Sequence, residues 1–228
     1  MSWDFAVSLV PAWHATVFAP YFVIGAVHSG VSGVVTMMVV LRGAFKWQDY
    51  ITPDHFDALG RLLIPVATAW LYFFMLDVLF GIYGGESREA GVMNQRLFEW
   101  PYAFFFVLII VLGYIIPVGL WLFRSVRRNI MWMFFLSIMV NVSMWLERLW
   151  LVIPGIQNKE RFTFDWAIYT PGVVEFSLVF ASFGLVSLAL LMFSKFFPLI
   201  PVWEEKEGQL FREEIKIGRR TVPAIVRE

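Results

Sequence analysis

Long apolar runs separated by short polar connections dominate the pattern of this chain. A helix needs about 20 apolar residues to cross the hydrocarbon core of a bilayer. Five runs meet that length, at residues 17–41, 59–83, 102–123, 130–153 and 171–194. They lack the short alternation of barrel strands, and backbone groups cannot stay unpaired in lipid. The pattern therefore predicts an all-α integral membrane bundle of five transmembrane helices.

The polar segments around these runs divide the chain into three parts. Residues 1–16 form an outer N-terminal segment, residues 17–200 the five-helix membrane domain, and residues 201–228 a charged tail of mixed sign. The segment before the first run has neither a basic leader nor a small-residue cleavage site, so we expect no signal peptide there.

The basic residues predict the orientation, because Lys and Arg are retained on the cytoplasmic face. The first and third connections and the tail are rich in them, whereas the second and fourth connections mix a few with acidic residues. We therefore expect a multi-pass protein with a periplasmic N-terminus and a cytoplasmic C-terminus. The basic residues of the first and third connections are Arg42, Lys46, Arg61, Arg124, Arg127 and Arg128.

Composition narrows the possible chemistry. Hydrophobic residues make up 59% of the 228 positions, as suits a lipid-embedded protein, and 18 basic residues balance 18 acidic ones, so nothing favours nucleic acid as a partner. The chain has no cysteine, which excludes thiolate-held iron–sulfur clusters and covalent haem. His14 and His28 lie on or beside one run and His55 in the opposite connection, so they do not converge on a haem. We expect no haem, iron–sulfur cluster or metal in this chain.

Ionisable residues inside apolar runs are costly in lipid and are functional candidates by default. Counting at 1.5 Å per residue, we expect one of them near the midplane and four at a shared outer depth. They form a candidate proton route: His28 at the midplane, then Asp77, Glu147, Arg148 and Glu175.

Structural readings of the same residues stay open. Arg148 could form a structural ion pair, and His28 could be an interior histidine whose hydrogen bonds are satisfied. The Glu175 side chain could extend to the membrane interface. Glu147 and Arg148 point about 100° apart on a helix, so we expect Arg148 to pair across helices with Asp77 or Glu175. Small residues at every fourth position from Gly25 predict close helix packing.

Several motifs together carry a family resemblance. They are WDFA at 3–6, PAWHATVFAPYF at 11–22, the small residues of 25–30, DYIT at 49–52 and NVSMWLER at 141–148. Over residues 3–198 the chain resembles the polysulfide-reductase-type (NrfD-like) quinone-binding membrane subunits, most of all those of alternative complex III. Members of this family contain two helical bundles, and this chain is similar to the second, C-terminal one.

The resemblance implies a membrane subunit of a respiratory or photosynthetic quinol-oxidising complex in the bacterial inner membrane. Its cofactor would be menaquinone or another quinone at a shared site. Partners would be iron–sulfur and c-type haem subunits and a further helical subunit that supplies the first bundle. An acid or an imidazole must accept the quinol protons. The resemblance implies that Asp4 is the catalytic base and that His14 relays its proton. It also implies that Trp3 forms an aromatic wall of the cofactor site and that residues 1–16 lie at the entrance to this site.

Two other functions remain alternatives. One is a non-catalytic scaffolding or proton-conducting subunit of such a complex. The other is a small transporter module, although its site would lie near the midplane, and the acids here lie further out. Whether the chain is part of an enzyme, and whether it is a split gene or a piece of a longer subunit, stays open.

Overall fold

The computed structural model describes residues 2–84, 87–157, 172–197, 214–217 and 220–223. They belong to two compact units, Met1–Tyr169 and Thr170–Glu228. Most of the predicted fourth connection and most of the predicted tail lie outside the described residues.

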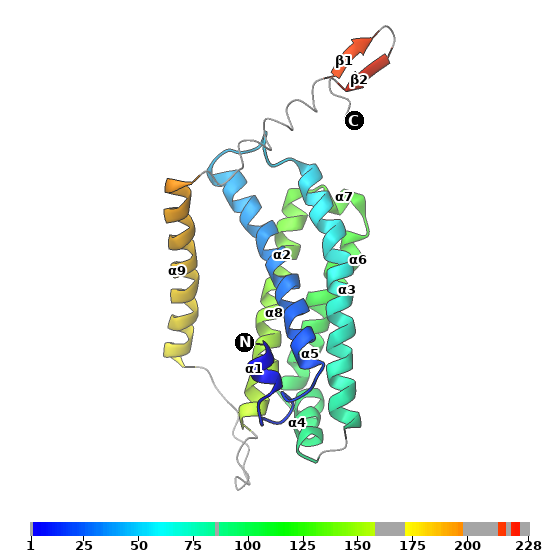
Figure 1. The fold of residues 1–228 in the computed structure, drawn as a ribbon, viewed down its shortest axis with the longest axis vertical. Helices are drawn as coiled ribbons and strands as arrows, with labels where there is room; N and C mark the ends of the chain where they lie inside the picture. The colour runs from blue at the N-terminus through cyan, green and yellow to red at the C-terminus, as the bar shows by residue number, and fades with distance from the viewer. Residues whose placement is uncertain (1, 85–86, 158–171, 198–213, 218–219, 224–228) are drawn as a thin grey trace. The chain divides into compact units, whose positions relative to one another are not determined.

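The first unit is a bundle of long helices lying side by side (Figure 1). The long helices are α2 (Phe18–Ala44), α3 (Pro53–Tyr83), the run α5 (Tyr102–Ile110), η1 (Val111–Ile115) and α6 (Ile116–Trp121), and α8 (Ile130–Gln157). Two short helices, α1 (Ser2–Ala6) and α4 (Ser87–Phe98), lie at one end of the bundle, and α7 (Arg124–Arg127) lies at the other. We call these the α4 end and the α7 end.

The second unit contains α9 (Val173–Phe196) and a hairpin of β1 (Glu214–Ile217) with β2 (Arg220–Pro223). The strands are antiparallel, with Glu214 opposite Pro223. In the described part of the chain, five helical stretches are long and apolar enough to span a membrane, and they coincide with the five predicted runs. The prediction of an all-α membrane domain with five spanning helices is confirmed, and the short hairpin follows those helices in sequence. The boundaries predicted at 16/17 and 200/201 stay a prediction.

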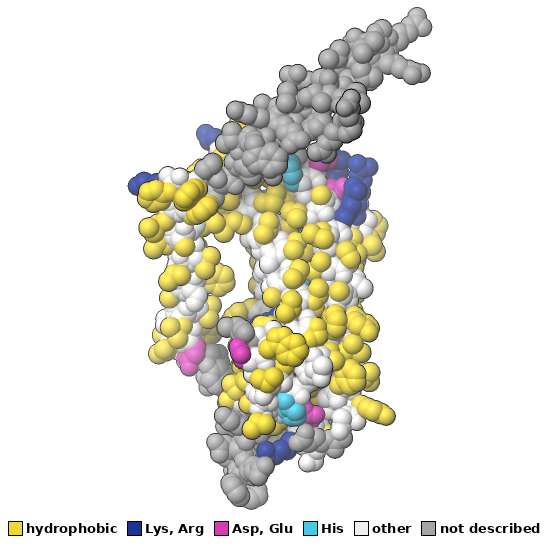
Figure 2. All heavy atoms as spheres, viewed as in Figure 1, with side chains coloured by type: hydrophobic (Ala, Val, Ile, Leu, Met, Phe, Trp, Pro, Cys, Tyr) yellow, Lys and Arg dark blue, Asp and Glu magenta, His cyan; other side chains and the backbone are white. Residues whose placement is uncertain are grey.

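Aromatic rings fill the interior of the first unit. Trp70 stacks on Phe74 with 5.3 Å between ring centroids, and Phe74 contacts Trp150 at 5.4 Å. All three side chains are fully buried. On the face seen in Figure 2 the flank of the bundle is mainly hydrophobic, and charged side chains gather toward its ends. An apolar flank between polar ends is what a bilayer requires.

A π-helical turn interrupts the third long helix just before Pro117. Proline has no backbone N–H and disturbs the helical hydrogen bonds around it. Gly113 lies in this turn, and a Cβ added there would be 2.6 Å from Ser143 Oγ. The Ser143 hydroxyl donates to the Ile109 carbonyl at 2.9 Å. The glycine therefore lets α8 approach closely enough for this buried hydrogen bond.

Candidate functional site

A fully buried carboxylate, that of Glu147, joins α2, α3 and α8. The Tyr21 hydroxyl donates to Glu147 Oε1, and the indole Nε1 of Trp70 donates to the same oxygen at 3.1 Å. The other oxygen, Oε2, lies 3.4 Å from Arg148 Nε. Burying a carboxylate requires hydrogen bonds and a counter-charge, and this site supplies both.

The pairing of Arg148 differs from the prediction. It was expected to reach Asp77 or Glu175, but in the structure its partner is its sequence neighbour Glu147. Its guanidinium carbon lies 3.9 Å from the ring centroid of Phe22 on α2. The arginine side chain is long enough to curve round the helix, so the angle between neighbouring positions does not keep the charges apart. A Cβ on Gly25 would be 2.6 Å from Arg148 Nη2, so this glycine makes room for the charge.

His28 lies one helical turn along α2 from Gly25 and is fully buried. Its ring lies 5.6 Å from that of Trp70. Neither ring nitrogen has a hydrogen-bond partner among the described residues. Further along the same α2–α8 seam, the hydroxyls of Thr36 and Ser137 share a hydrogen bond of 2.8 Å. The small-residue ridge of α2 thus packs against a polar row on α8.

A small cavity opens at the α4 end of the bundle. Its volume is about 110 Å³. Three ionisable residues, His14, Asp77 and Glu89, line it together with the smaller or apolar residues Ala12, Ala15, Phe80, Gly81 and Met93. His14 Nε2 lies 3.2 Å from Glu89 Oε1, and His14 Nδ1 lies 3.1 Å from the Val10 carbonyl oxygen. Asp77 is 3% exposed, and its Oδ2 has no hydrogen-bond partner in the part of the chain that the structure describes.

Arg96 of α4 lies one turn after Met93, a residue that lines this cavity, and was not singled out from the sequence. Its side chain is fully buried, and its Nη2 donates to the Leu151 carbonyl at 2.6 Å. The guanidinium carbon lies 5.1 Å from the ring centroid of Trp150. Burial lowers the pKa of the Arg96 guanidinium from its ordinary value, and the nearby Asp77 carboxylate opposes that change. Arg96 shares a helix face with Val92 and Met93, a spacing that the sequence did contain.

The N-terminal motif is tied to the end of α8 by its tryptophan. Trp13 Nε1 donates to the Leu151 carbonyl at 3.2 Å, and its ring lies against Gly155. Pro154 lies inside α8 at this point and disturbs the backbone hydrogen bonding there. The Leu151 carbonyl accepts two buried hydrogen bonds, one from Trp13 and one from Arg96.

The structure brings some of the predicted site residues together and leaves others apart. His14 and Asp77 share the cavity, and Glu147 lies deeper in the same unit. Trp3 and Asp4 are exposed on α1 and do not line the cavity. Glu175 belongs to the second unit, where its Oε2 accepts a hydrogen bond of 2.9 Å from the Gly172 N–H at the start of α9. This contact is a helix cap.

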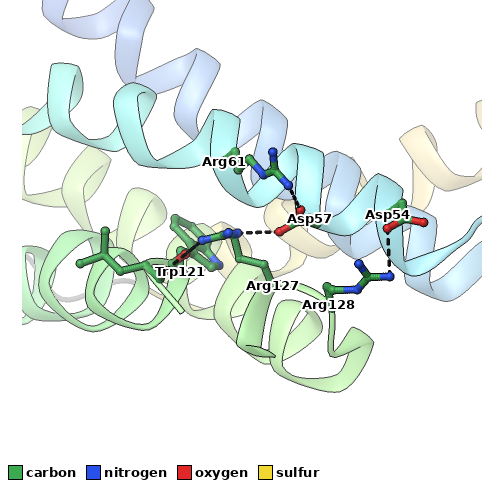
Figure 3. Close-up of polar contacts among 7 residues, drawn as sticks. Asp54, Asp57, Arg61, Trp121, Arg127 and Arg128 are labelled. Atoms are coloured by element: carbon green, nitrogen blue, oxygen red, sulfur yellow. Dashed lines mark hydrogen bonds and ion pairs between the residues drawn. The ribbon is translucent and has the colours of Figure 1, made fainter. Parts of the chain in front are cut away.

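The α7 end carries a separate group of ion pairs (Figure 3). Asp57 accepts hydrogen bonds from Arg61 on its own helix and from Arg127 Nε at 2.8 Å. The same Arg127 donates through Nη1 to the Trp121 carbonyl at 2.5 Å. Asp54, one turn earlier, lies 3.0 Å from Arg128 Nη2. These contacts join α3 to the end of α6 and to α7.

Comparison with known proteins decides the family. The sequence model described as "Polysulphide reductase, NrfD" matches residues 2–159, more than half of the chain. The chain belongs to the NrfD family. It is a multi-pass membrane protein of that family, as the sequence motifs predicted.

Among curated proteins, this NrfD-family chain is similar to a selenate reductase subunit of Mesobacillus selenatarsenatis. The two are 24% identical over 206 residues, which cover 86% of this chain and 46% of the relative. The chain thus spans about half the length of the curated relative that it matches.

Proposed function

We propose that this chain is a membrane subunit of an oxidoreductase complex, similar to alternative complex III, and that it contributes to quinol binding and proton transfer. Membership of the NrfD family and similarity to a protein named as a reductase subunit support the first part. The cavity that brings His14, Asp77 and Glu89 together is the observation that carries the second part. Acids and an imidazole held around a small space are suited to passing protons.

The size of the cavity supports a hydrated site rather than a quinone pocket. At about 110 Å³ it is well below the roughly 300–1,000 Å³ of typical ligand pockets. It has room for a few water molecules, each of which occupies about 30 Å³ in the liquid. In this proposal the cavity is therefore a hydrated proton site, and the quinone lies outside it.

The quinone site is proposed to be shared between subunits. Trp3 and Asp4 are exposed on α1, at the same end of the bundle as the cavity, and supply one wall. A further helical membrane subunit supplies the other wall, and neighbouring iron–sulfur and c-type haem subunits hold the redox centres. When bound, the quinol supplies two electrons and two protons.

Each of the site residues of this chain has a separate role in this proposal. Asp4 accepts a proton at the quinone wall and His14 relays it toward the cavity. Asp77 holds a proton within the cavity, close to the buried groups of the bundle. Glu147, with His28 beyond it, extends the proposed route into the membrane, since the Tyr21 and Trp70 donors hold its carboxylate in place. Arg148 is the counter-charge of Glu147.

Turnover of the assembled complex tests this function. The complex is purified through a tag on this chain, and quinol-dependent electron transfer is compared for Asp4→Asn, Asp77→Asn and the exposed control Glu99→Gln. A general base contributes on the order of 100-fold or more, so Asp4→Asn is expected to lose at least that much, while Glu99→Gln keeps the wild-type rate. Unchanged turnover in Asp4→Asn removes it from the quinol site. If Asp77→Asn is unchanged as well, the scaffolding alternative is favoured.

A further inference from the structure

Arg96 is a buried cation to which the described residues bring no carboxylate within ion-pair distance. Among them the ion pairs within 4.0 Å involve other cations. One nitrogen, Nη2, reaches the Leu151 carbonyl, but Nε and Nη1 have no hydrogen-bond partner there. An arginine has five N–H donors and stays protonated, so a buried one that leaves two nitrogens unmatched requires other partners.

Asp77 offers the complementary groups. Its Oδ2 is buried and has no partner among the described residues. The carboxylate and the guanidinium lie near enough for each charge to act on the other. Their separation exceeds 4.0 Å, since no ion pair joins them in the described part of the chain. A carboxylate and a guanidinium that face each other beyond direct contact are commonly bridged by water.

Helix packing places Asp77 of α3 and Arg96 of α4 at the same height along the two helices. Met93 of α4 packs on Gly81 of α3 so closely that a Cβ on that glycine would be 2.5 Å from the Met93 Cε. Gly81 lies one turn after Asp77, and Met93 lies about one turn before Arg96. Helices α3 and α4 are consecutive, and the chain turns back between them (Figure 1). One turn back along α3 from Gly81 therefore corresponds to one turn forward along α4 from Met93, which brings Asp77 opposite Arg96.

We propose that Arg96 is a positioning residue for Asp77, joined to its carboxylate by ordered water at the inner wall of the cavity. Its fixed positive charge stabilises the carboxylate form and so keeps Asp77 ready to accept a proton. The inference rests on the proposed function in one respect only, namely that Asp77 handles protons. Arginine suits this role because it supplies charge without itself exchanging a proton at ordinary pH.

The other groups that face Asp77 do not replace Arg96. Glu89 of α4 and Glu147 of α8 are acids and oppose a further negative charge. Tyr21 of α2 is a neutral donor already bound to Glu147. His14, before α2, lies next to Glu89. Among these groups Arg96 is the one permanent cation that acts on Asp77.

Infrared difference titration of the full chain in lipid nanodiscs tests the inference without using turnover. The protonated carboxyl band of Asp77 is assigned by its loss in Asp77→Asn. In Arg96→Gln we expect this band to persist to a pH about one to three units higher, the usual effect of removing an adjacent opposite charge. Arg96→Lys keeps the charge and is expected to titrate closer to the wild type. Arg88→Gln, at an exposed position of the same helix, is the matched control.

A titration of Arg96→Gln that coincides with the wild type overturns the inference. If Arg96→Gln fails to fold, the double variant Arg96→Gln/Asp77→Asn is expected to restore the folded yield, because it leaves no uncompensated charge. Failure of that rescue also overturns it. A shifted band in Arg96→Gln together with normal turnover in Asp77→Asn would retain the pairing and reject the proposed function.

Discussion

The two aspartates at the start of α3 give a matched pair for testing the ion pairs of the α7 end. Asp57 and Asp54 lie one turn apart on the same helix, and each pairs with an arginine near α7. Their side chains differ in exposure, at 5% for Asp57 and 73% for Asp54. The same change, Asp→Asn, therefore removes a buried charge in one case and an exposed charge in the other.

The structure sets the expected magnitudes. Removing one partner of a buried ion pair costs about 3–5 kcal/mol. Arg127 keeps its carbonyl partners at the end of α6, and an asparagine oxygen still accepts a hydrogen bond, so we expect about 2–3 kcal/mol for Asp57→Asn. For Asp54→Asn we expect less than about 1 kcal/mol, because exposed pairs contribute little.

Intrinsic tryptophan fluorescence in nanodiscs is a suitable assay, because the chain has no cysteine for thiol dyes and the fully buried Trp121 lies beside Arg127. With about 2–4 °C per kcal/mol for a chain of this size, Asp57→Asn is expected to lower the thermal midpoint by about 4–12 °C. Asp54→Asn should stay within about 4 °C of the wild type. Equal shifts for the two variants would refute the argument that burial makes the Asp57 contacts strong.

Two further predictions concern close packing inside the first unit. Gly113→Ala is expected to lower the free energy of unfolding by about 1–3 kcal/mol, because its Cβ would meet Ser143 Oγ. Gly119→Ala is the control and should be neutral or stabilising, because nothing lies within 4 Å of its Cβ. Chemical unfolding in micelles distinguishes the two variants. Trp13→Phe is expected to cost about 1–2 kcal/mol by losing the indole hydrogen bond to the end of α8, while Trp132→Phe at a half-exposed position should change the unfolding midpoint little.

Much of the fold could be predicted because the bilayer imposes it. The hydrocarbon thickness fixes how long a span must be, so the five runs could be read from composition and length alone. Burial of Asp77 and Glu147 could be predicted for the same reason, since each lies within an apolar run. Family membership followed from the motifs, such as the one that contains Trp13.

The partners of the charges could not be predicted in the same way. Which groups Arg148 reaches depends on side-chain length and on the space left by Gly25, neither of which appears in a helical projection. Arg96 lies in a connection between spans, where a charged residue is ordinarily solvated, and only the packing of α4 on α3 and α8 buries it. The donor from Trp13 reaches a backbone carbonyl of α8 that lies 138 positions away in sequence, and no local pattern identifies that acceptor.

The number of protons released per electron is the quantity on which the proposed role of Asp77 acts. It is measured with a pH indicator in vesicles that contain the assembled complex, during quinol oxidation, for the wild type and for Asp77→Asn with Glu99→Gln as the control. We expect Asp77→Asn to lower this ratio and Glu99→Gln to keep it. A wild-type ratio at normal turnover in Asp77→Asn would contradict a role for the cavity in proton transfer.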